Sequence, residues 1–219
     1  MNKSNEYDVV RDQFFGLQQL DKDIDIINII NNYNATLGYI GTNTDHFKYS
    51  NYKELFDKTL REESFTISLL DDSMIALYYE FDGMGKIMKH NLSFIPNYRM
   101  DLFRDNDREF VDDELDISDE ILSRRLSNYL RVDYDGKGYA EYYHSIVHMH
   151  IGVFSDSIRM PFQTIVYPFE FLYLIFKYVY HLEDDCLKCL DCKCEKSIEL
   201  SENELKRFSV IYGTNGLGD

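Results

Sequence analysis

Three histidines lie within seven positions of the segment HSIVHMHIG, residues 144–152. Side chains of a β-strand alternate between its two faces, so His144, His148 and His150 would share one face of a strand here. Two neutral imidazoles at this spacing can bind one metal ion, and the same pair can act as general acid and base near neutral pH. The alternative is a structural strand, whose histidines only form hydrogen bonds inside a core.

Arg159 follows this segment, and a guanidinium beside two imidazoles would suit a phosphate or a developing oxyanion. Asp133, Tyr134 and Tyr142 are candidate partners that would orient the imidazoles. The spacing does not match the HExxH helix of metalloproteases. Ile146 also interrupts the row of alternating histidines that a histidine-triad nucleotide hydrolase would need. The predicted catalytic set is His144, His148, His150 and Arg159.

A second group of potential metal ligands is the cysteine cluster CLKCLDCKC, which contains Cys186, Cys189, Cys192 and Cys194. Two thiolates at CxxC spacing can bind one ion, and four can complete a tetrahedral zinc site. We therefore expect zinc here, in a structural role, with His181 able to replace one cysteine. An iron–sulfur cluster and a set of reduced thiols are the alternatives.

The elements that position these residues can be read from the periodicity of the apolar side chains. From residue 65 the period is two, which predicts strands at 65–70, 73–81 and 86–96 joined by tight turns. Two more strands are predicted at 130–135 and 142–152. The fold class is therefore α+β, an antiparallel sheet of about five or six strands with helices packed on it.

The predicted helices flank these strands in the chain. Apolar residues at helical spacing, including Ile24, Ile27 and Ile30, predict one long helix or two shorter ones within residues 7–33. The other elements are a short strand at 35–42, a helix at 51–60, helices that begin after Ser118 and Ser201, and a buried helix that begins at Pro168 and continues to Leu182. Residues 1–183 should form one α+β domain, and residues 184–219 a cysteine-rich turn and short helix packed on it.

Charge and composition narrow the possible partners. The net charge is −16, which disfavours broad contact with nucleic acid because such binding neutralises phosphates with Lys and Arg. A local basic site, or a nucleic-acid role shared with a partner, stays open. The N-terminus lacks the apolar segment of a signal peptide, and the cysteines form no secretory disulfide framework, so we expect a cytoplasmic protein that does not bind membranes.

Several segments together carry a resemblance to a known family. These are RVDYD, HMHIG at residues 148–152, Arg159-Met160-Pro161, the aromatic helix after Pro168 and the upstream hairpin YYEFDGMGKIMKHNLSFIP. In this order they resemble the bacterial family known as domain of unknown function 2290. The resemblance implies no activity, but it suggests that the histidine strand and Arg159 belong to the defining unit. Such small bacterial proteins are associated with phage defence.

Two functions are compatible with these observations. The first is an acidic subunit that binds a larger protein partner, because Tyr and Phe are abundant (18 and 15 residues) and aromatic side chains are enriched at interfaces. The second is a nuclease-like phosphoester hydrolase that uses His148, His150 and Arg159. The sequence favours the first function and places any chemistry at the histidine strand.

Overall fold

The fold is an antiparallel sheet with helices on it, which confirms the predicted α+β class. It is described from a computed structural model, which covers residues 5–36, 38–42, 52–98, 129–137, 146–152, 159–162 and 164–192. Within these ranges the sheet has nine strands, more than the five or six expected. Among the helices in these ranges, none is long and apolar enough to cross a membrane.

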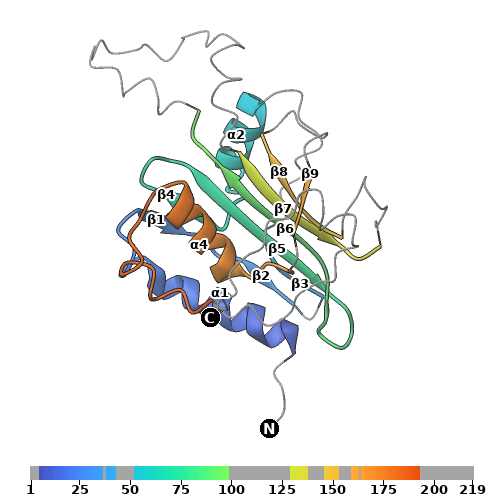
Figure 1. Cartoon of the computed structure of the whole chain (residues 1–219). Coiled ribbons are helices and arrows are strands. Elements are labelled where there is room, and N and C mark those ends of the chain that lie inside the picture. The colour runs from blue at the N-terminus through green and yellow to red at the C-terminus, as the bar shows by residue number, and fades with distance from the viewer. Residues whose placement is uncertain are drawn as a thin grey trace, which may run out of the picture.

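The sheet order is β1-β4-β5-β6-β7-β8-β9, and β3 pairs with both β2 and β5 (Figure 1). The strands are β1 (Ile27–Ile30), β2 (Asn34–Ala35), β3 (Tyr39–Gly41), β4 (Ile67–Leu69), β5 (Met74–Phe81), β6 (Ile87–Ile95), β7 (Leu130–Asp135), β8 (Val147–Ile151) and β9 (Arg159–Pro161). The predicted meander of residues 65–96 is present as β4, β5 and β6. One edge of β5 is shared, since β4 pairs with its first half and β3 with its second half.

Two helices, α1 (Glu6–Leu20) and α4 (Pro168–Tyr178), cover one face of the sheet (Figure 1). Asn5 caps α1 by accepting a hydrogen bond from the Asp8 N–H, and Pro168 opens α4 as predicted. The two helices meet where the Phe169 N–H donates to the Gln13 side chain. Their apolar side chains and the inward side chains of the strands form the main core.

The opposite face of the sheet carries a smaller apolar cluster and a row of polar side chains. Helix α2 (Tyr52–Arg61) packs at one end of this face. The smaller cluster consists of Tyr52, Leu55, Phe56, Phe65, Met74, Ile95, Tyr98 and Tyr129. Beyond it, β6, β7 and β8 present polar residues in register, so the sheet separates an apolar face under α1 and α4 from a polar face.

The helical prediction was wrong for Ile27 and Ile30, which lie in strand β1. Their spacing of three, usual for one face of a helix, arises here from a bulge in the β1–β4 pairing. Ile27 pairs with Leu69 and Ile30 with Ile67, and the register shifts between residues 27 and 29. The extra residue of the bulge lets both isoleucines contact the core. Likewise, the segment 35–42 contributes to a β2–β3 hairpin instead of one strand.

The beginning of the cysteine-rich segment packs on the domain. Leu187 and Leu190 are buried in the main core, and the Lys177 ammonium pairs with the Asp184 carboxylate at 2.8 Å. The helices predicted after Ser118 and Ser201 lie outside the described residues.

Candidate metal centre

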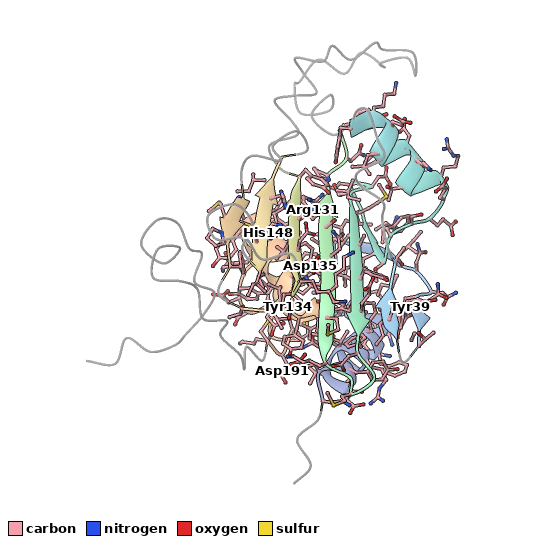
Figure 2. All side chains as sticks on the ribbon, turned by 90° about the vertical axis from the view of Figure 1, so that its right-hand side faces the viewer. Tyr39, Arg131, Tyr134, Asp135, His148 and Asp191 are labelled. Atoms are coloured by element: carbon pink, nitrogen blue, oxygen red, sulfur yellow. The ribbon has the colours of Figure 1, made fainter. Side chains whose placement is uncertain are left out.

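Three potential metal ligands converge on the polar face of the sheet: Asp133 of β7 and His148 and His150 of β8. In the β7–β8 pairing Asp133 lies opposite His148, and Arg131 lies opposite His150. Figure 2 shows Arg131 and His148 on these adjacent strands. The alternation expected for the histidine strand is present, since Val147 and Met149 point into the main core.

The ligand atoms of the three residues are close together and shielded from solvent. His150 Nε2 lies 3.4 Å and His148 Nε2 lies 3.8 Å from the same carboxylate oxygen, Asp133 Oδ2. The two imidazole rings meet edge to face with centroids 4.8 Å apart. His148 and His150 are only 2% and 3% exposed, and His150 Nε2 has no hydrogen bond of good geometry.

The carboxylate of Asp133 is held in its ionised form. Burial raises its pKa, but the contact with His150 and the positive charge of Arg131 outweigh burial and bring the pKa down to about 2. Arg131 Nε donates to Asp133 Oδ2 at 2.9 Å, and the Asn91 amide donates to Oδ1 at 2.6 Å. At neutral pH Asp133 is therefore a charged oxygen ligand beside two imidazoles.

A hydrogen-bonded network connects this group to the α2 end of the sheet. Ser93, which lies opposite Arg131, donates to the Asn91 side chain at 3.2 Å. Burial raises the pKa of the Tyr129 phenol, while hydrogen bonds with Ser93 and Arg131 lower it, and the result is about 12. Tyr129 thus stays neutral and links the polar network to the apolar cluster under α2. Buried networks of this kind fix the positions of their members.

Two of the separations between ligand atoms fit a small metal ion, and all three ligand atoms lie within 4.8 Å of one another. Zinc bonds of about 2.0–2.1 Å in a tetrahedral site place neighbouring ligand atoms roughly 3.3 Å apart. The distances of 3.4 and 3.8 Å from the imidazole nitrogens to Asp133 Oδ2 are close to that separation. A set of two histidines and one carboxylate also leaves coordination positions open, as catalytic zinc sites and non-haem iron sites do.

His90 provides an internal comparison, because it is buried on the opposite face of the same sheet. Its ring packs against Tyr79 and Tyr134 in the main core, and its Nε2 accepts from the Val166 N–H at 3.4 Å. Burial lowers its pKa to about 4. His90 is therefore a neutral core histidine, and it is not one of the three converging ligands.

The structure brings together only some of the predicted site residues. His148 and His150 lie together with Asp133, which the sequence suggested only as an orienting partner. Arg159 is the pairing partner of His150 on β9. Tyr134 points to the core face, and His144 and Tyr142 lie outside the described residues.

Sequence reasoning missed the contributions of Arg131, Asn91 and Ser93. The signal for Arg131 was available, because in the strand LRVDYD residues 131 and 133 share a face. Asn91 and Ser93 alternate in the same way on β6, but their register against β7 depends on a pairing between segments far apart in the chain.

The cysteine hypothesis stays a prediction. Cys186, Cys189 and Cys192 are not joined in disulfide bonds, and the Cys189 thiol lies 3.7 Å from the Cys186 carbonyl. Burial raises the pKa of Cys189. In the part of the chain that is described, the cysteines do not form a group of converging ligands, and Cys194 lies outside it.

Comparison with known proteins gives one match. The model of the family described as "Uncharacterized conserved protein (DUF2290)" matches residues 23–210. We found no significant match among curated proteins or among solved structures. The matched range contains every residue of the Asp133–His148–His150 group and of the network around it.

Proposed function

The chain belongs to this DUF2290 family, and we propose that it is a metal-dependent hydrolase whose ion is bound by Asp133, His148 and His150. One observation carries the proposal. Two buried imidazoles and an ionised carboxylate place ligand atoms within 4.8 Å of one another, and one of these atoms, His150 Nε2, is buried without a hydrogen bond of good geometry. An unsatisfied ring nitrogen alone does not identify a metal ligand, because His90 Nδ1 in the core also lacks a hydrogen bond, but among the described residues His90 has no converging carboxylate and imidazole beside it.

The ligand types favour zinc, with iron(II) or manganese(II) as other ions that accept two imidazoles and a carboxylate. A zinc ion at such a site lowers the pKa of a bound water and so supplies a nucleophile at neutral pH. The residues of the chain would position that ion. Asp133 keeps its charge through Arg131 and Asn91, and the packing of the two imidazoles against each other fixes the directions of their nitrogens.

The burial of the site and the net charge of −16 favour a compact substrate over a polynucleotide. The phosphoester chemistry suggested by the sequence is therefore proposed for a small molecule.

The test is the metal content and affinity of the purified protein, measured by elemental analysis and by titration with Zn²⁺. We expect one equivalent of metal that depends on His150, with His150→Gln weakening that site by at least about tenfold. The metal-loaded wild type should hydrolyse a chromogenic phosphate ester faster than His150→Gln. Metal that is equally retained in His150→Gln would contradict the proposal.

The matched control is His90→Gln, the same substitution at a buried histidine on the other face of the sheet. It should keep the metal, because His90 is not among the converging ligands. In a second control, Cys186, Cys189, Cys192 and Cys194 are all changed to serine. Any metal bound by the thiols is lost from this variant, whereas the equivalent of metal that depends on His150 should remain.

A second candidate function is that of a subunit which binds a larger protein, as the sequence favoured. Strand β1 supports it, since among the described residues it lies at the edge of the sheet and pairs only with β4. Ile29 on this strand is 49% exposed, and Leu70 beside it is 65% exposed. An apolar edge strand can add a strand from another chain.

Ile29→Lys tests this second function, because lysine on an edge strand opposes strand addition. A partner that co-purifies with the tagged wild type from native cells should be lost with Ile29→Lys. It should be retained with Met84→Lys, which changes an exposed apolar residue on the β5–β6 turn. Equal loss or equal retention in both variants would argue against β1 as the interface.

A further inference from the structure

The charges around the proposed metal centre favour a second ligand. Asp133 contributes one negative charge, and Arg131, paired with it at 2.9 Å, contributes one positive charge. Imidazoles bind metal in their neutral form, so these charges cancel before an ion enters. Among the described residues, the other charged positions in register on this face are also balanced in number. Glu80, Lys89 and Asp135 lie side by side on β5, β6 and β7, and Arg159 lies opposite His150 on β9.

A divalent ion would add two positive charges to this buried site. The side chains of Arg131, His148 and His150 are between 3% and 7% exposed, so water can compensate little of that charge. Added charge inside a protein is energetically costly unless it is paired. An anion that enters with the metal removes this cost.

Arg131 is positioned to hold that anion. Its Nε donates to Asp133 Oδ2, which is also the oxygen that both imidazole nitrogens approach. An ion bound to Oδ2 would compete with this hydrogen bond for the same oxygen. The guanidinium can then turn its donors to an oxyanion on the metal, and Arg binds phosphoryl oxygens with two parallel hydrogen bonds.

We propose that the site binds a divalent metal ion and a phosphoryl oxyanion as a cooperative pair, with Arg131 exchanging Asp133 for the oxyanion. A phosphoryl group with two negative charges balances the ion, whereas a carboxylate balances only half of its charge. This inference rests on the proposed metal site and assigns its substrate class, a compact phosphate ester or phosphate itself. It also makes Arg131, instead of Arg159 alone, a phosphate-binding residue.

The experiment measures the affinity for Co²⁺, which has visible absorption bands that report coordination by imidazole, with and without 1 mM inorganic phosphate. Phosphate should strengthen the His150-dependent Co²⁺ site about tenfold or more and shift its bands, within the range usual for coupled ligands. Free phosphate competes for Co²⁺ in solution, so without cooperation the apparent affinity would fall. Acetate at the same concentration should have less than a third of the effect of phosphate.

Variants separate the inference from the proposed function. Arg131→Gln should bind Co²⁺, but phosphate should not strengthen the binding. If Arg131→Gln does not fold, Arg131→Lys keeps the positive charge and should lose at least half of the phosphate enhancement. Arg11→Gln, an exposed arginine of α1, should retain the full enhancement.

Two outcomes would contradict the paired binding or the metal site. If Co²⁺ binds through His150 but phosphate has no effect, or acetate acts as strongly, the paired binding is wrong and the metal site stands. If no His150-dependent Co²⁺ binding occurs with or without phosphate, the metal site itself is wrong.

Discussion

Replacement of Gly41 by alanine is expected to lower the free energy of unfolding by about 3 kcal/mol or more. Gly41 ends β3 with a φ of 108°, which side chains of L-residues rarely tolerate. A Cβ atom at this position would also lie 1.9 Å from the Leu77 carbonyl oxygen of β5. This oxygen accepts the Thr42 N–H, so the strand cannot move away without losing that bond. Urea unfolding of the two proteins measures the difference.

Gly83→Ala is the control for this substitution. Gly83 lies in the β5–β6 turn, and a Cβ there would meet nothing within 4 Å. Its unfolding free energy should stay within about 0.5 kcal/mol of wild type. A Gly41→Ala protein as stable as Gly83→Ala would mean that β3 does not pack against β5 as described.

Removal of either member of the Arg131–Asp133 pair should destabilise the metal-free protein by about 3 kcal/mol. Each single change, Arg131→Met or Asp133→Asn, removes the 2.9 Å charge contact of a partner that stays buried. The double variant should cost clearly less than the sum, because both charges are then absent, with a coupling of about 2 kcal/mol. A double-mutant cycle by urea unfolding at pH 7 provides this value.

The matched pair is Arg11–Asp8 on the surface of α1. Its charged groups are separated by 3.0 Å, close to the 2.9 Å of the buried pair, but both side chains are about a third exposed. Its coupling should stay below about 1 kcal/mol. Equal coupling in the two cycles would show that burial does not strengthen the Arg131–Asp133 interaction.

The Asp133 carboxylate also makes the stabilisation from the Arg131–Asp133 pair depend on pH. The pKa of Asp133 is lowered in the folded chain to about 2 from an ordinary 3.8, so its contribution is present above pH 4 and is lost as pH falls toward 2. Asp133→Asn should remove that part of the acid sensitivity.

Local patterns were sufficient for those parts of the fold that depend on local interactions. The alternation of residues 65–96 and the turn at Asp82 predicted β4, β5 and β6, and Pro168 marked the start of α4. The periodicity led to a wrong helix prediction at Ile27 and Ile30, because a β-bulge produces the same three-residue spacing as one face of a helix. Nothing in the segment itself specifies that bulge, which is defined by the pairing with β4.

The candidate site was likewise predicted only as far as local sequence patterns allow. The HxH spacing identified His148 and His150 because both lie on one strand. Asp133 appeared only as a partner, and Arg131, Asn91 and Ser93 were missed, because their convergence depends on the register between β6, β7 and β8. That register joins residues 91 and 133, which no short sequence window contains.

The meeting of α1 with α4 has a consequence for the chain during its synthesis. Gln13 contacts Phe169, so the core face of the sheet is closed by a helix made more than 150 residues after the one beside it. The β4–β5–β6 hairpins need only neighbouring residues and can form early, while their apolar face waits for α4. A nascent chain that pauses before residue 168 would expose this surface, which makes that interval the one in which a chaperone would be needed most.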